Sequence, residues 1–113
     1  MLKVLGLGDN VCDVYLHTGT MYPGGQAVNF AVYARMLGAE SDFMGVFGKD
    51  AVADHVQASL DAHGVGHSHC RIYEGENGFA RVTLVKEAIK VVFCSSIQFI
   101  WKKRIWNMRM VLI

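Results

Sequence analysis

The sequence predicts an α/β fold, because short apolar segments alternate with helical ones in its first half. Residues 2–7 and 41–47 are typical of strands, and residues 26–37 and 51–63 are typical of helices. Such alternation indicates βαβ units with a right-handed crossover and a parallel sheet. With 113 residues, 52% of them hydrophobic and 19% charged, the chain has a globular composition and room for one domain at most.

The first expected strand, residues 2–7, is a run of Leu and Val ended by Gly-Asp-Asn. This pattern is typical of a buried strand of the parallel type. Residues 11–16 continue it as an extended segment. Residues 18–25 have loop chemistry, with Pro23 fixing φ and two glycines that are free to adopt positive φ.

Two helices are expected. Residues 26–37 contain no breaker, and Gly38 follows as a C-terminal cap signal. Because this segment is apolar almost all round, we expect it to be buried on more than one side. Residues 51–63 carry one apolar stripe, formed by Val52, Val56 and Leu60, so we expect this helix to expose its other face.

Two further strands are expected at residues 67–73 and 79–85. The five residues between them, 74–78, include two glycines and suit a tight connection. The pattern therefore predicts that these two strands pair as a hairpin.

Charge divides the chain at residue 85. Residues 1–85 hold 5 Lys+Arg and 9 Asp+Glu, net −4, whereas residues 86–113 hold 6 and 1, net +5. The overall net charge of +1 argues against a nucleic-acid-binding protein. We interpret residues 86–113 as an atypical basic, hydrophobic tail from truncation or a frameshift. There are two alternatives. The segment could be a basic amphipathic element that binds an anionic membrane or a nucleic acid, or it could be an ordinary packed strand or helix.

The compartment is predicted to be cytoplasmic. The first residues lack the long apolar region and cleavage site of a secretory leader, and the apolar run 91–101 is shorter than the about 20 residues of a membrane span. The three cysteines are widely spaced and form no Cys-x-x-Cys pair, which favours reduced thiols over a disulfide framework.

The first candidate site follows the first strand. Asp9, Asn10 and Asp13 would lie at the carboxyl end of that strand, where open α/β sheets bind their ligands. Acidic and amide groups there suit a hydroxyl-rich ligand. A turn that only caps the strand is the alternative. A dinucleotide site is disfavoured, since Val11 stands where the Gly-x-Gly-x-x-Gly fingerprint has its third glycine.

The second candidate is Gly24-Gly25 leading into a helix, with Asn29 one turn inside. Free backbone N–H groups and the amide of Asn29 suit an anion or a polar substrate, and the P-loop ending Gly-Lys-Ser/Thr is missing. A third cluster consists of His63, His67, His69 and Cys70. These residues could bind zinc. The alternative is that they are exposed strand residues, with His63 at the end of a helix where it interacts favourably with the helix dipole.

Four blocks in order resemble the N-terminal part of the PfkB-family (ribokinase-like) carbohydrate kinases. They begin at Gly8 (GDNVCD), Gly24 (GGQAVNFA), Gly45 (GVFGKD) and Leu60 (LDAHGV). The resemblance implies a ribokinase-like βαβ portion of a parallel sheet, incomplete in this chain, with a small β lid around residues 11–22 and 67–85. The first block, extended to Tyr15, is most similar to the fructoselysine 6-kinase branch.

The resemblance also implies roles for the candidate residues. In that family an aspartate matching Asp13 holds sugar hydroxyls, and a Gly-Gly-x-x-x-Asn block, here ending at Asn29, closes on the same sugar. We therefore expect a small sugar or sugar-amine substrate and no metal ligand. The expected substrate-binding residues are Asp9, Asn10, Asp13, Gly24, Gly25 and Asn29.

The family's catalytic base and phosphate-binding backbone lie in a Gly-Ala-Gly-Asp motif that this chain lacks, since no glycine or aspartate follows residue 85. ATP and Mg²⁺, bound by full-length relatives, are thus not expected to bind this chain alone, and no catalytic residue is assigned. We predict that residues 1–85 are the sugar-binding portion of a kinase, inactive alone. The alternative is a non-catalytic polyol- or partner-binding module that dimerises. A homodimer through the lid is a possible assembly, with neither nucleic acid nor membrane as a partner.

Overall fold

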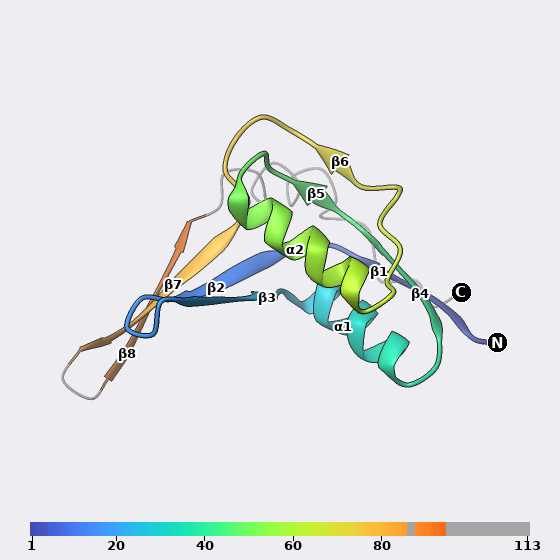
Figure 1. Ribbon diagram of the computed structural model, residues 1–113, viewed down its shortest axis with the longest axis horizontal. Coiled ribbons are helices and arrows are strands. Elements are labelled where there is room, and N and C mark those ends of the chain that lie inside the picture. The colour runs from blue at the N-terminus through green and yellow to red at the C-terminus, as the bar shows by residue number, and fades with distance from the viewer. Residues whose placement is uncertain (86–87, 95–113) are drawn as a thin grey trace.

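The described part of the chain folds into two helices and three small sheets (Figure 1). We describe it from a computed structural model of the chain, which covers residues 1–85 and 88–94. The class is α/β, as predicted. In Figure 1 the four-stranded sheet extends to the left of the two helices, one two-stranded sheet lies above them and the other lies toward the right.

Strands β1 (Lys3–Leu7) and β4 (Glu40–Met44) form a parallel pair whose register runs from Lys3 opposite Glu40 to Leu7 opposite Met44. Helix α1 (Gln26–Met36) lies between them in the chain and packs on one face of the pair. Gly6 makes this packing possible, because a Cβ there would collide with the carbonyl oxygen of Ala27. The βαβ unit predicted from the sequence is therefore present.

The core joins both helices to this sheet. The expected strand 41–47 is divided at Gly45 into β4 and β5 (Val46–Phe47), and β5 pairs in parallel with β6 (Arg71–Ile72). Phe43 and Phe47 are fully buried, with ring centroids 5.9 Å apart. The same buried cluster includes Ala27, Val28 and Ala31 of α1 and Ala53, Val56 and Leu60 of α2.

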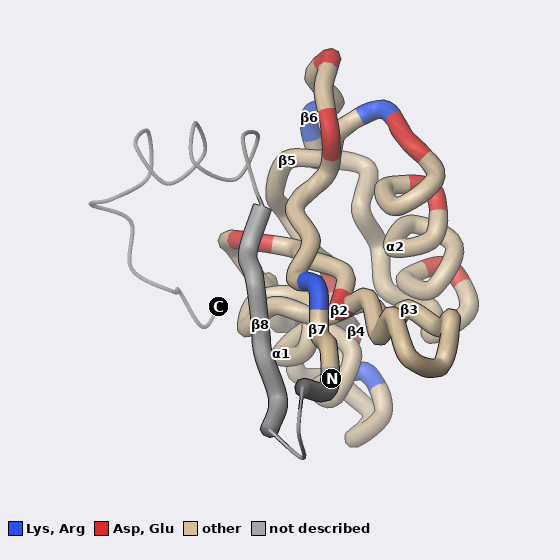
Figure 2. The backbone as a smooth tube through the Cα atoms, turned by 90° about the vertical axis from the view of Figure 1, so that its left-hand side faces the viewer, with Lys and Arg blue, Asp and Glu red and all other residues tan. Residues whose placement is uncertain are grey.

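Helix α2 (Ala51–Ala62) begins at an aspartate cap, since the Asp50 carboxylate accepts a hydrogen bond from the backbone N–H of Ala53 at 2.8 Å. It is amphipathic, as predicted, with Val56 and Leu60 fully buried and Asp54 exposed. Its acidic residues are visible along the tube in Figure 2.

Helix α1 differs from the prediction that it is buried on more than one side. Ala27, Val28 and Ala31 are buried, whereas Tyr33 is 62% and Met36 65% exposed. Among the described residues, those that bury α1 leave its Tyr33 and Met36 side chains exposed, so the helix is not buried on all the sides that its apolar composition suggests.

The largest sheet contains β2 (Val11–Tyr15), β3 (Thr20–Gly24), β7 (Phe79–Val85) and β8 (Ala88–Cys94), in the order β3-β2-β7-β8. Here β2 pairs antiparallel with β3 and parallel with β7. We call this sheet the lid. It contains the predicted lid segment 11–22, but only residues 79–85 of the predicted segment 67–85, because β6 belongs to another sheet. Residues 18–25, expected as a loop, contain strand β3, which pairs with β2.

The predicted hairpin of residues 67–73 and 79–85 is therefore wrong. Strand β6 pairs with β5, and β7 pairs with β2 and β8, so the connection 74–78 links two different sheets. Strand β8 lies past residue 85 and pairs antiparallel with β7. The predicted division of the chain at residue 85 stays a prediction, and the expectations for residues 95–113 lie outside the described residues.

Candidate functional site

The hairpin of β2 and β3 brings Asp13 beside Gly24. The two strands pair in antiparallel register, with Asp13 opposite Tyr22 and Val11 opposite Gly24. A Cβ at Gly24 would lie 3.3 Å from Oδ2 of Asp13, so the carboxylate lies over the bare backbone of the glycine. Asp13 is half-buried and makes no hydrogen bond or ion pair with another described residue. Its acceptor capacity is thus open on this face of the lid.

Gly25 connects the lid to α1 and contacts the end of the first strand. Its φ of 97° lies in the left-handed region that side chains disfavour, and a Cβ there would be 3.0 Å from the backbone oxygen of Asp9. The backbone carbonyl of Gly25 accepts a hydrogen bond from the N–H of Asn29 at 2.9 Å, and the Asn29 side chain is exposed. The structure thus brings the segments of Asp9, Asp13, Gly24, Gly25 and Asn29 together.

Asn10 is placed differently from the other predicted residues. It is fully buried, its Nδ2 donates to the carbonyl of Val46 at 2.7 Å, and its Oδ1 accepts from Nδ2 of Asn77 at 2.8 Å. Both ends of the amide are therefore bound within the protein. In this structure Asn10 fixes the passage from β1 into the lid, and its expected contact with a substrate stays a prediction.

Asn77 and Asp50 complete a polar network that sequence reasoning missed. Oδ1 of Asn77 accepts from the N–H of Gly48 at 3.1 Å, and the N–H of Asn77 donates to Oδ2 of Asp50 at 2.9 Å. The network joins the first strand, the cap of α2 and the start of β7. The Asp50 cap was visible in the sequence as an aspartate directly before a helix, but its bond to Asn77 spans 27 residues and has no local signal.

Cys12 lies directly behind Asp13 on the opposite face of β2. It is fully buried. Burial, reinforced by the negative charges of Asp13 and Asp50, raises the pKa of the Cys12 thiol from 9.0 to about 11. A neutral thiol is a poor nucleophile, so Cys12 is a packing residue at neutral pH.

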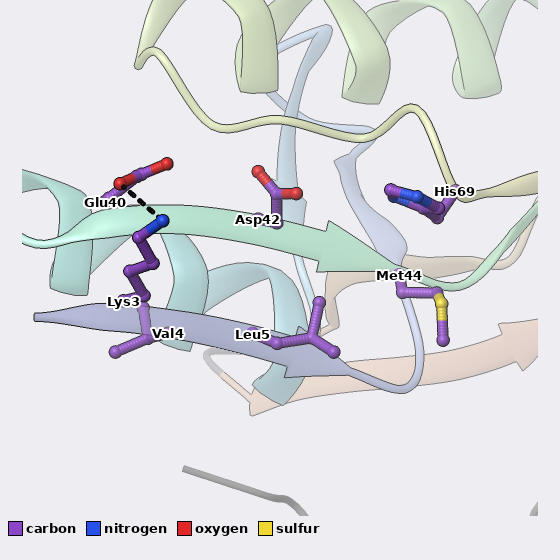
Figure 3. Close-up of a pocket in the computed structure, with 7 residues that line it drawn as sticks. All are labelled: Lys3, Val4, Leu5, Glu40, Asp42, Met44 and His69. Atoms are coloured by element: carbon purple, nitrogen blue, oxygen red, sulfur yellow. Dashed lines mark ion pairs between the residues drawn. The ribbon is translucent and has the colours of Figure 1, made fainter. Parts of the chain in front are cut away.

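A cavity of about 460 Å³ lies elsewhere, on the face of β1 and β4 away from α1 (Figure 3). It is lined by Lys3, Val4, Leu5, Glu40, Asp42, Met44 and His69. Nζ of Lys3 is 3.6 Å from Oε2 of Glu40, and both side chains are largely exposed. None of the predicted site residues lines this cavity. We place the candidate site where Gly24 lies beside Asp13 and Gly25 beside Asp9, and not at this cavity.

The histidines proposed as a zinc cluster have protein partners of their own. Nε2 of His67 is 2.7 Å from Oδ1 of Asp61, and Nδ1 of His63 is 2.8 Å from the carbonyl of Ser59. Across residues 1–85 and 88–94, no three His, Cys, Asp or Glu side chains are arranged to hold a metal ion. In the same described part of the chain, no helix is long and apolar enough to cross a membrane.

Comparison with known proteins tests the resemblance seen in the four sequence blocks. Residues 2–97 match the profile of the pfkB family carbohydrate kinases. The chain belongs to this family. Within it, the chain is 41% identical over 90 residues to a fructosamine kinase of Bacillus subtilis and 31% identical over 84 residues to a fructoselysine 6-kinase of Escherichia coli. These matches cover 80% and 74% of the chain and 32% of each relative, so the chain spans about a third of their length.

Solved structures of the family confirm the fold. The ribokinase of Arabidopsis thaliana, solved with ribose and ATP, superposes with a TM-score of 0.75 at 22% identity, over 82% of this chain and 35% of its own. The predicted ribokinase-like class is confirmed. The order of the four sequence blocks is sufficient to predict the pfkB family. The first and second of these blocks contain the residues of the candidate site.

Proposed function

We propose that this chain is the sugar-binding portion of a carbohydrate kinase, in which Asp13 accepts hydrogen bonds from sugar hydroxyls. The observation that supports this is the half-buried Asp13 carboxylate beside Gly24, with its acceptor capacity open to a ligand. Hydrogen bonds from hydroxyl groups to a charged carboxylate are short and about twice as strong as neutral ones. A polyol held in this way is both bound and oriented.

The neighbouring residues have complementary roles in this proposal. Gly24 lets the Asp13 carboxylate lie close to the backbone, Gly25 lets the chain pass close to Asp9, and Asn29 offers both a donor and an acceptor from α1. Asp9 provides a second carboxylate at the end of β1. We assign Asn10 a positioning role, because its amide is used entirely within the protein.

Sugar-amines are the substrate class that we propose. The support is the similarity to a fructosamine kinase and a fructoselysine 6-kinase, at 41% and 31% identity. The site is also acidic, since residues 9–25 hold Asp9 and Asp13 and no Lys or Arg. A sugar with a protonated amine would therefore meet a favourable potential.

We propose that phosphoryl transfer does not occur in this chain alone. ATP would supply the phosphoryl group in a complete kinase, but the residues present do not fit a triphosphate. The cavity described above is lined by Glu40 and Asp42 against a single lysine, Lys3, which pairs with Glu40, so its lining has no excess of Lys or Arg for an anion. Residues 86–113 contain no glycine for a phosphate-binding loop. The chain's own residues hold and orient the acceptor sugar.

Calorimetric titration of the 113-residue chain with fructosamine (1-amino-1-deoxyfructose) tests the proposal. We expect a binding heat that Asp13→Ala abolishes. The matched control is Asp54→Ala, which removes an exposed carboxylate from α2 and should leave binding unchanged. Binding that survives Asp13→Ala would contradict the site. With ATP and Mg²⁺ added, phosphorylation of the sugar by the wild-type chain would contradict its proposed inactivity.

A further inference from the structure

Two tyrosines extend the candidate site along the same face of the lid hairpin. Tyr22 lies directly opposite Asp13, and Tyr15 follows Asp13 by two residues, so all three side chains lie on one face of the sheet. The two rings meet edge to face, with centroids 5.6 Å apart and an angle of 75° between their planes. Tyr22 is 58% exposed.

The surroundings of this pair favour a cation. The carboxylate of Asp13 is the charged group beside Tyr22, and the hairpin from residue 9 to residue 25 contains no Lys or Arg. The nearest cation on the paired strand is Arg81, which lies opposite Val14 and stacks on the Phe79 ring at 5.1 Å. Because Val14 and Asp13 alternate in β2, Arg81 lies on the other face of the sheet and does not pair with Asp13.

An aromatic face beside a carboxylate is the chemistry that recognises an alkylammonium group. The ring quadrupole attracts a cation within about 6 Å of its centroid, and the effect is largest where the cation is partly desolvated. We propose that Tyr22, in edge-to-face contact with Tyr15, binds the protonated amine of a sugar-amine whose hydroxyls are held at Asp13. Tyr22 thereby discriminates a sugar-amine from a neutral sugar. This inference rests on the proposed function and adds a specificity-determining residue to it.

The test compares two ligands that differ at one atom. Fructosamine has a protonated amine where fructose has a hydroxyl, so the ratio of their dissociation constants isolates the amine. For wild type we expect fructosamine to bind more tightly, by about three- to tenfold, as a cation–π contact of this kind provides. Tyr22→Phe keeps the ring and should keep the ratio. Tyr22→Ala and Tyr22→Leu should lower the ratio by at least about twofold, leaving only the preference that the Asp9 and Asp13 carboxylates provide, while the affinity for fructose changes little.

Matched controls separate this effect from folding and assembly. Tyr33→Ala removes an equally exposed tyrosine from α1, 62% exposed against 58% for Tyr22, and should leave the ratio unchanged. Tyr22→Leu retains apolar volume, so it guards against a loss of structure in Tyr22→Ala. A ratio of dissociation constants that Tyr22→Leu leaves unchanged overturns the inference. It is also overturned if Tyr22→Ala leaves the ratio unchanged and alters only the oligomeric state of the chain, measured by analytical ultracentrifugation. Absence of binding for both sugars in wild type overturns the proposed function itself, and this inference with it.

Discussion

Replacing Asn77 with alanine removes the centre of the polar network beneath the lid. Its Oδ1 accepts from the N–H of Gly48 at 3.1 Å, and its Nδ2 donates to Oδ1 of Asn10 at 2.8 Å. Asn10 and Gly48 are both buried, so truncation deprives two buried polar groups of these bonds. The backbone bond from Asn77 to Asp50 does not depend on the side chain and remains.

The magnitude follows from the cost of a buried polar group without its partner, which is about 1–3 kcal/mol each. Two such groups give an expected loss of about 2–6 kcal/mol in the free energy of unfolding. Whole domains are stable by only about 5–15 kcal/mol, so Asn77→Ala should remove a large fraction of the total. The matched control is Asn29→Ala, the same chemical change on an exposed turn of α1, which should change stability by less than about 0.5 kcal/mol.

Urea unfolding followed by circular dichroism measures both variants against wild type. The double variant Asn10→Ala/Asn77→Ala adds a second check, because the two amides bond to each other. The sum of the losses in unfolding free energy of Asn10→Ala and Asn77→Ala should exceed the loss of the double variant by about 1 kcal/mol or more. If Asn77→Ala shifts the urea midpoint no further than Asn29→Ala does, or if the two losses simply add, the network does not stabilise the fold as argued.

Three further expectations concern single positions. Gly25→Ala should destabilise the chain by about 1–2 kcal/mol more than Gly38→Ala in urea unfolding. Both glycines have φ near 97°, but only at Gly25 would an added Cβ lie 3.0 Å from a backbone oxygen. Equal losses for the two variants would show that this contact does not affect stability. The free energy of unfolding should fall as pH rises from 9.0 to about 11, since the unfolded thiol ionises while folded Cys12 stays protonated. Cys12→Ala should have a flatter pH profile, and a profile identical to wild type would contradict this. Lys49→Ala breaks a 2.6 Å ion pair with Glu74, but both side chains are mostly exposed, so we expect a loss below about 1 kcal/mol; a larger loss in urea unfolding would refute this.

The helices could be predicted from the sequence nearly to the residue. Residues 26–37 and 51–63 were expected, and α1 and α2 span Gln26–Met36 and Ala51–Ala62. Their boundaries are set by local chemistry, namely a glycine after the last turn and the Asp50 side chain at the start of α2. Local signals of this kind are complete within a few residues, so no tertiary information is needed to read them.

Strand pairing could not be predicted in the same way. The segment 74–78 has the composition of a hairpin turn, yet β6 pairs with β5 and β7 with β2. Cys12 and its partner Phe79 are far apart in sequence, and nothing in the turn itself distinguishes a hairpin from a passage between sheets. Pairing of this kind is decided by which strand edges the core leaves open, and that is a property of the whole fold.

The candidate site was predictable where it followed from alternation and from the family blocks, and less so where it depended on distant partners. In the extended passage 9–13, Asn10 and Cys12 are fully buried, whereas Asp9 and Asp13 are half-buried. Within β2, which begins at Val11, alternation places Cys12 and Asp13 on opposite faces, and Asn10, just before the strand, is buried like Cys12 and unlike the two carboxylates. The same amide group thus has two roles in one site. At position 10 it holds the lid in place, and at position 29, on an exposed helix turn, it is open to a ligand.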